Sequence, residues 1–185
     1  MKSPSLQRSL LTGAVGFGLA SVCVFATVAF AERWMYTNLG LAGAYITWTV
    51  LFILLGGGAL LPLAGSLRGP RFFGLFALAF LAYAAGWIGA YFTLRGALGE
   101  WVGSLAGCLL MALVFAWGFG ALRSFPRLFA WLFVANSIGY FLGSALNNSI
   151  GGKPGMMLWG VAYGLFLGAG LGAVLSFAQG RAKTR

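Results

Sequence analysis

Residues 156–178 read MMLWGVAYGLFLGAGLGAVLSFA, an apolar stretch without a single charged side chain. About 20 such residues suffice to cross a bilayer as an α-helix. Outward from this stretch, five more apolar runs of similar length fill the chain, separated by short segments that hold nearly all of the charge. The sequence therefore predicts an all-α integral membrane protein, a bundle of six transmembrane helices in one domain, residues 1–185. The six expected spans are residues 9–31, 41–65, 72–94, 101–122, 128–147 and 156–178.

The composition of the chain leads to the same class of protein. Of its 185 residues, 61% are hydrophobic and 8% are charged, and the mean hydropathy is +0.92. A soluble domain carries about a quarter charged residues, so soluble and disordered proteins are excluded. The net charge of +10 alone would fit a nucleic-acid-binding protein. In so apolar a chain we expect contact with the lipid bilayer and none with nucleic acid.

Residue types that the sequence lacks narrow the chemistry further. The chain has no His and no Asp, only Glu32 and Glu100 as acids, and two widely separated cysteines, Cys23 and Cys108. Metal sites, haem ligation by imidazole and general acid–base catalysis draw on His and carboxylate clusters. The sequence thus predicts no metal site and no cofactor, and it favours a protein that is not an enzyme.

The basic residues predict the orientation in the membrane. Nine of them fall at the termini and in alternate connections: Lys2, Arg8, Arg68, Arg71, Arg123, Arg127, Arg181, Lys183 and Arg185. The opposite side holds three: Arg33, Arg95 and Lys153. Because Lys and Arg are retained on the cytoplasmic side, we expect both termini in the cytoplasm and the protein in the cell (inner) membrane. Residues 29–31, Ala-Phe-Ala, also resemble a signal-peptidase site, and cleavage there would leave five spans.

The chain also shows a weak internal repeat that would make the fold three tandem helical hairpins. Each hairpin would begin after an Arg and end in a Gly-rich helix closed by another Arg, over residues 8–68, 71–123 and 127–181. The junctions LRGPR (67–71) and LRSFPR (122–127) are similar. An alternative is that a chain rich in Ala, Gly, Leu and Phe resembles itself by composition alone.

Four glycines recur at four-residue steps in the last expected span: Gly160, Gly164, Gly168 and Gly172. They share one helix face. In lipid, such small-residue faces allow close backbone approach and mark where a neighbouring helix lies. The neighbour is either another helix of this chain or a partner membrane subunit, including a second copy in a homo-oligomer.

Polar and aromatic residues at helical spacing predict a ligand site. Asn136, Tyr140 and Ser144 lie at positions i, i+4 and i+8 of the fifth span, and an amide at bilayer depth needs a partner. Tyr83 and Trp87 in the third span and Tyr163 in the sixth supply aromatic faces. We expect these six side chains to line a cavity that opens toward the outer side, because apolar pockets with a few convergent polar groups bind small molecules. Hydrogen bonding between helices is the alternative role for the polar residues.

Two functions fit this pattern. The first is binding or passage of a small uncharged or aromatic solute without its own ion coupling, as a facilitator or as the solute-binding subunit of a transporter. The second is a structural or assembly subunit of a larger membrane complex. In length, six spans and cytoplasmic termini, the chain resembles the substrate-binding subunits of energy-coupling-factor vitamin transporters. Their first helix carries small residues four positions apart, as Ala14 and Gly18 or Gly16 and Ala20 would here. The resemblance is one of topology and assigns no binding residue.

Overall fold

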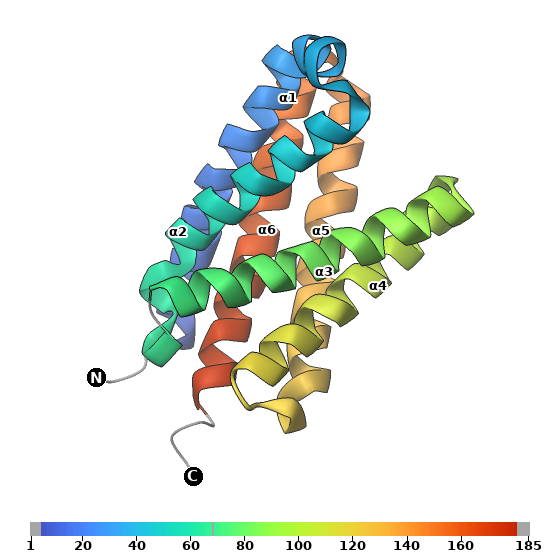
Figure 1. Cartoon of the computed structure of the whole chain (residues 1–185). Helices are drawn as coiled ribbons and strands as arrows, with labels where there is room; N and C mark the ends of the chain where they lie inside the picture. The colour runs from blue at the N-terminus through green and yellow to red at the C-terminus, as the bar shows by residue number, and fades with distance from the viewer. Residues whose placement is uncertain (1–4, 68, 181–185) are drawn as a thin grey trace.

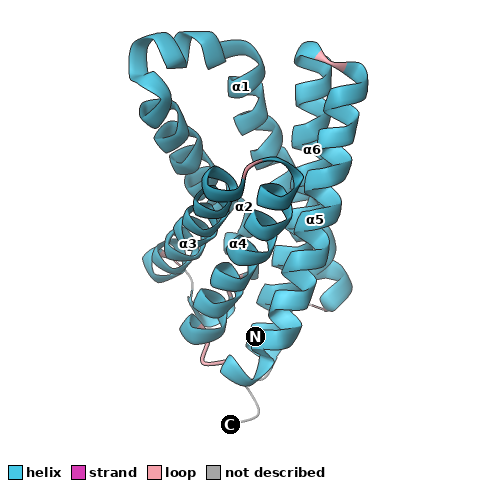
Figure 2. Ribbon diagram, turned by 90° about the vertical axis from the view of Figure 1, so that its right-hand side faces the viewer, coloured by secondary structure: helices cyan, strands magenta, loops and turns pink. Residues whose placement is uncertain are grey.

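The computed structural model describes residues 5–67 and 69–180, and its regular secondary structure in these residues is helical throughout (Figure 1). Figure 2 shows that only short loops connect the helices. The elements are α1 (Leu6–Leu51), a π-helical turn η1 (Phe52–Gly56), α2 (Gly57–Leu60), short 3-10 turns η2 (Leu61–Leu63) and η3 (Gly65–Leu67), α3 (Pro70–Leu94), α4 (Gly96–Gly118), η4 (Leu122–Ser124), α5 (Phe125–Ile150) and α6 (Gly152–Gly180). The prediction of an all-helical protein is confirmed.

Within residues 5–67 and 69–180, five helical stretches are long and apolar enough to cross a membrane. They are Leu6–Leu63, Pro70–Leu94, Gly96–Gly118, Leu122–Ile150 and Gly152–Gln179. The first covers the span expected at residues 9–31 and all but the last two residues of the span expected at 41–65, so the described residues form five such stretches where the sequence predicted six. The difference arises because helix α1 continues through Glu32 and Arg33, beyond the end expected at residue 31.

The first stretch is bent at Gly40, which divides it into a first arm (residues 6–39) and a second arm (residues 41–63). Gly40 has φ 67° and ψ 179°, a conformation that only glycine adopts readily. In Figure 1 the blue first arm rises to this bend and the cyan second arm returns from it. At the other end the arms are in contact, because a Cβ on Gly16 would lie 3.2 Å from the Cβ of Ala59.

Helix α6 is the most buried of the long helices. In an apolar segment of 18 residues of α6, 67% of the residues are buried, against 28–44% in the corresponding segments of the other four stretches. It packs between the first arm of α1 and α5, whereas α3 packs mainly on α4. The face that it turns to α1 carries Gly160, Gly164, Gly168 and Gly172.

These four glycines allow the backbones of α1 and α6 to approach closely. A Cβ on Gly160 would lie 2.6 Å from the Cβ of Phe25, and one on Gly164 would lie 2.5 Å from the Cβ of Ser21. A Cβ on Gly168 would collide with the carbonyl oxygen of Gly13, and one on Gly172 with that of Ser9. The Ser21 hydroxyl also donates a hydrogen bond of 2.8 Å to the carbonyl oxygen of Gly160. A helix of the same chain thus occupies the face that a partner subunit would need.

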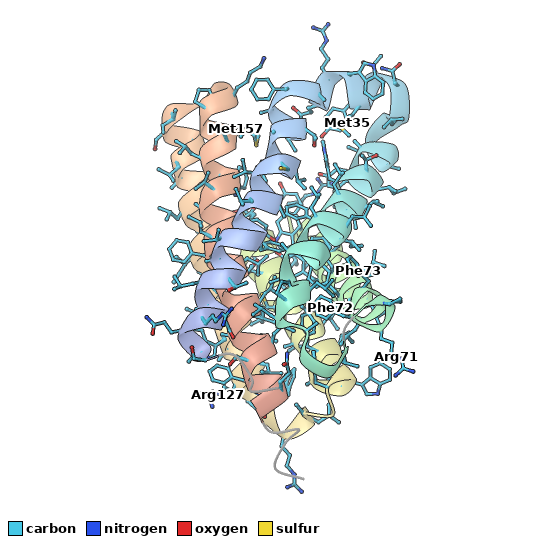
Figure 3. The ribbon with its side chains drawn as sticks, turned by 90° about the vertical axis from the view of Figure 1, so that its left-hand side faces the viewer. Met35, Arg71, Phe72, Phe73, Arg127 and Met157 are labelled. Carbon is cyan, nitrogen blue, oxygen red and sulfur yellow. The ribbon has the colours of Figure 1, made fainter. Side chains whose placement is uncertain are left out.

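The two ends of the molecule differ in packing. Figure 3 shows Arg71 and Arg127 toward one end and Met35 and Met157 toward the other. Toward the Arg end, where the described chain begins and ends, Phe and aliphatic side chains form a fully buried core. Its largest members are Phe17, Phe72, Phe76, Phe115, Leu60, Met111, Leu128, Leu132, Leu167, Leu171 and Leu175. Toward the other end the helices enclose a cavity.

Candidate ligand cavity

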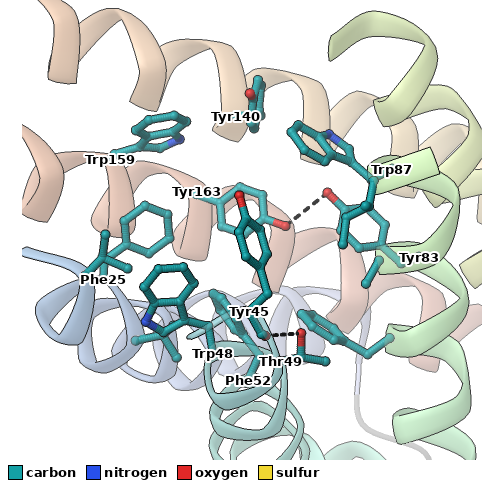
Figure 4. A pocket seen from close by; sticks show the side chains of 15 residues that line it. Phe25, Tyr45, Trp48, Thr49, Phe52, Tyr83, Trp87, Tyr140, Trp159 and Tyr163 are labelled. Carbon is teal, nitrogen blue, oxygen red and sulfur yellow. Dashed lines mark hydrogen bonds between the residues drawn. The ribbon is translucent and has the colours of Figure 1, made fainter. Parts of the chain in front are cut away.

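A partly open cavity of about 250 Å³ lies between both arms of the first helical stretch and helices α3, α5 and α6 (Figure 4). Ten of its fifteen lining residues are aromatic, and no charged side chain lines it. The lining residues are Val24, Phe25, Val28, Tyr45, Trp48, Thr49, Phe52, Phe80, Tyr83, Ala84, Trp87, Ile88, Tyr140, Trp159 and Tyr163. Such a surface offers stacking and van der Waals contact to an apolar or flat molecule.

Helical periodicity explains how the elements supply this lining. The second arm contributes positions 45, 48, 49 and 52, and α3 contributes positions 80, 83, 84, 87 and 88. These spacings of three and four residues place each set on one helix face. Phe52 begins the π-helical turn η1, and such turns occur frequently at functional sites.

The floor of the cavity is the contact between the second arm and α3. The rings of Phe52 and Phe80 lie 5.3 Å apart. Closer to the Arg end, a Cβ on Gly56 would lie 3.4 Å from the Phe76 ring, and one on Gly57 would lie 3.0 Å from the Phe73 ring. The cavity begins where these contacts end.

A chain of side-chain hydrogen bonds runs from the cavity wall into the protein and joins four helices. Tyr163 of α6 donates its hydroxyl proton to the Tyr83 hydroxyl oxygen (3.1 Å), and Tyr83 of α3 donates to Asn136 Oδ1 (2.9 Å). Asn136 Nδ2 of α5 donates to Ser104 Oγ of α4 (2.7 Å). The Ser104 hydroxyl is in turn hydrogen-bonded to that of Ser137 (3.0 Å). All five side chains are buried, so the chain holds α3 and α4 against α5 and α6.

A second hydrogen bond connects a lining residue of the cavity, Tyr140, to Glu100. The Tyr140 hydroxyl donates to Glu100 Oε1 at 3.4 Å, a long bond. The Tyr140 ring lies 5.7 Å from the ring of Trp87 and 5.6 Å from that of Trp159. Glu100 itself does not line the cavity.

Three tryptophans of the lining have buried indole nitrogens without an acceptor in the described part of the chain: Trp48, Trp87 and Trp159. Two of these indoles are pressed against glycines of neighbouring helices. A Cβ on Gly143 of α5 would lie 3.0 Å from Trp159 Nε1, and one on Gly103 of α4 would lie 3.2 Å from Trp87 Cδ1. These two indoles therefore face the cavity mainly with their ring surfaces.

The six side chains expected at the site separate into two groups. Tyr83, Trp87, Tyr140 and Tyr163 line the cavity. Asn136 has no exposed surface and lies behind Tyr83, so a direct contact with a ligand, as the sequence suggested, does not follow from its position. Ser144 is half-buried and is not among the lining residues.

Sequence reasoning missed the contribution of the two arms of the first stretch. Tyr45, Trp48 and Phe52 have the same helical spacing as the aromatic residues of α3, and this signal was available in the sequence. Which helix lies opposite α3 depends on how the chain folds back at Gly40, and spacing alone does not give that.

No Glu, Cys, Lys or Arg side chain is among the fifteen residues that line the cavity. Residues 5–67 and 69–180 contain no group of three or more His, Cys, Asp or Glu side chains that could hold a metal ion. Cys23 is exposed and Cys108 is buried in the core, each as a free thiol. Comparison with protein families, curated proteins and solved structures finds no significant match to this chain.

Proposed function

We propose that this chain is a membrane protein that binds or passes a small, flat, uncharged solute, as a facilitator or as the solute-binding subunit of a transporter. The single observation that carries the proposal is the cavity of about 250 Å³ with ten aromatic side chains in its wall. Ligand pockets are typically apolar with a few polar groups and run from roughly 300 to 1,000 Å³. A cavity of about 250 Å³, slightly below this range, suits a molecule of one or two rings.

The charge distribution supports a neutral solute that moves without ion coupling. Carriers driven by protons or sodium usually place a carboxylate or His at bilayer depth. The acidic side chains of this chain, Glu32 and Glu100, lie near the Gly40 bend and in the first turns of α4, respectively. Movement of the solute is then downhill, or it draws energy from a separate subunit.

We further propose six membrane crossings with both termini cytoplasmic. Each arm of the first stretch is long enough to cross alone, because helices rise about 1.5 Å per residue and the hydrocarbon core is about 30 Å thick. The bend at Gly40 would then lie on the outer side. The side chains of Arg71 and Arg127 lie toward the end where the described chain starts and finishes, which favours a cytoplasmic assignment for that end.

This topology predicts the behaviour of reporter fusions. Green fluorescent protein fused after Arg185 should fluoresce, and alkaline phosphatase inserted at Gly152 should be active, because only cytoplasmic and periplasmic locations, respectively, permit these signals. An active phosphatase after Arg185 would contradict the orientation. Intact mass of the purified protein tests the five-span alternative, which requires a chain that starts at Glu32.

Filling the cavity should abolish binding. Ala84 lines the cavity from α3, whereas its neighbour Ala85 is exposed on the same helix. We expect Ala84→Phe to lower the affinity for a two-ring probe, naphthalene, at least tenfold, because the new ring occupies the space that the probe needs. Ala85→Phe is the matched control and should bind as the wild type does. Equilibrium dialysis against protein in nanodiscs, with empty nanodiscs as the blank, measures both affinities.

Equal binding by wild type, Ala84→Phe and empty nanodiscs would contradict the proposal. The alternative function, an assembly subunit, predicts that result together with obligate co-purification of other membrane subunits. Its main support in the sequence was the glycine face of α6. Because α1 of the same chain covers that face, the face no longer favours a partner subunit.

A further inference from the structure

The hydrogen bonds behind the cavity have a defined direction. Asn136 uses its amide nitrogen on Ser104, so its carbonyl oxygen faces Tyr83 and accepts the Tyr83 proton. A phenol has one proton to donate, and that of Tyr83 is therefore committed. Its oxygen accepts the proton of Tyr163, whose own single proton is thereby committed as well.

The Tyr163 hydroxyl ends this chain at the cavity, as Figure 4 shows. Within residues 5–67 and 69–180, no hydrogen bond is donated to its oxygen. A hydroxyl oxygen has two lone pairs. At the cavity wall Tyr163 can thus accept a hydrogen bond, and donating one would require breaking its bond to Tyr83.

Most other polar groups of the lining are engaged or turned aside; the indole N–H of Trp48 is a buried donor without an acceptor in residues 5–67 and 69–180. Thr49 donates to the carbonyl oxygen of Tyr45, and Tyr140 donates to Glu100. The nitrogen edges of Trp87 and Trp159 lie against α4 and α5. Tyr45 also lines the cavity, but the residue is 38% exposed. The acceptor best buried in the cavity is therefore the Tyr163 oxygen, on a side chain that is 7% exposed.

We infer that the solute is a flat neutral molecule with a hydrogen-bond donor, an N–H or O–H on an aromatic ring, which the Tyr163 oxygen accepts. This inference rests on the proposed function. Asn136 is a positioning residue in this arrangement, since it fixes the direction of the chain through Tyr83 without touching the solute. The pocket distinguishes donors from acceptors because a donor completes the chain, whereas an acceptor-only molecule leaves the Tyr163 oxygen unpartnered.

Three bicyclic probes of nearly equal shape test the inference: indole (a donor), benzofuran (its oxygen analogue without a donor) and 1-indanone (an acceptor). Dialysis against nanodiscs gives their affinities for the wild type. We expect indole to bind about tenfold more tightly than either of the others, the effect of one hydrogen bond. In Tyr163→Phe the preference for indole should vanish while benzofuran binding stays unchanged. Tyr36→Phe is the matched control and should keep the preference, because Tyr36 is 38% exposed and does not line the cavity.

Tyr83→Phe gives an independent measurement. Removing the Tyr83 oxygen frees the Tyr163 proton, so this variant should gain affinity for 1-indanone relative to the wild type, a change that mere loosening of the fold would not produce. Equal binding of the three probes to the wild type, tighter binding of 1-indanone, or loss of the preference in Tyr36→Phe would each overturn the inference while leaving a ligand cavity in place. Binding of none of the probes, together with no effect of Ala84→Phe on naphthalene, would refute the proposed function itself.

Discussion

Replacing Gly168 by Leu should prevent the chain from reaching its folded state. Even a Cβ at this position collides with the Gly13 carbonyl oxygen and lies 2.8 Å from the Cβ of Phe17. The Gly13 oxygen is part of the α1 backbone, and the Phe17 Cβ is bonded directly to that backbone, so neither atom can move aside by rotation of a side chain. Helices α1 and α6 would have to separate along their whole contact, and in lipid that contact depends on close packing rather than on exclusion of water.

The control substitution must be made at a glycine whose surroundings leave room for a side chain. Gly89 of α3 is exposed, and a Cβ on it would meet no atom within 4 Å. We expect Gly168→Leu and Gly164→Leu to lose the monodisperse peak in fluorescence-detected size-exclusion chromatography, and Gly89→Leu to retain it. If both α6 variants eluted and melted like the wild type, the packing of α6 on α1 would be wrong.

Replacing Asn136 by Leu should lower the stability by about 1–3 kcal/mol, the cost of leaving buried polar groups without partners. The substitution removes the acceptor of the Tyr83 proton and the donor to Ser104, and the side chain of Asn136 has no exposed surface through which water could compensate. The position of Asn136 behind Tyr83 makes stability the first quantity to change; any effect on ligand selectivity follows through Tyr83.

Asn148→Leu is the matched control, since Asn148 lies on the same helix and is exposed. Thermal unfolding in detergent should separate the two variants clearly. The combined variant Asn136→Leu, Tyr83→Phe, Tyr163→Phe, Ser104→Ala, Ser137→Ala removes every polar group of the hydrogen-bond chain and should recover part of the loss, because replacing all partners by apolar groups costs less than removing one. An Asn136→Leu protein as stable as the wild type would show that the four-helix chain of hydrogen bonds contributes nothing to the fold.

Much of the fold could be predicted from the sequence because hydropathy alone constrains it. A helix is the element that satisfies its own backbone in lipid, so long apolar runs such as residues 156–178 had to be helical. The turn at Gly151 (φ 71°) and the Pro residues in the first turns of α3 and α5 fit the connections expected there. The end of the first helix was misplaced, because Glu32 and Arg33 mark a membrane boundary without being helix breakers.

The candidate site could be predicted only in part, because residue spacing describes each helix by itself. Helical spacing showed that Tyr83, Trp87, Tyr140 and Tyr163 could share faces with their neighbours, and these four line the cavity. Spacing within one helix cannot say how far a side chain reaches toward the next. Asn136 therefore looked like a ligand contact, although Tyr83 stands between it and the cavity.

The sequence by itself determined that this protein is helical and apolar enough to lie in a membrane, that it has no His or Asp and only two Glu, and that one face of the last helix is lined by glycine. These properties follow from residue types and from periodicity, which are local. Only the tertiary structure decided that α1 covers the glycines of α6, that the second arm supplies Tyr45, Trp48 and Phe52 to the cavity, and that the hydrogen bonds run from Tyr163 to Ser104. Those properties depend on which helices become neighbours, and the bend at Gly40 and the close approach at Gly168 set that arrangement between residues far apart in the chain.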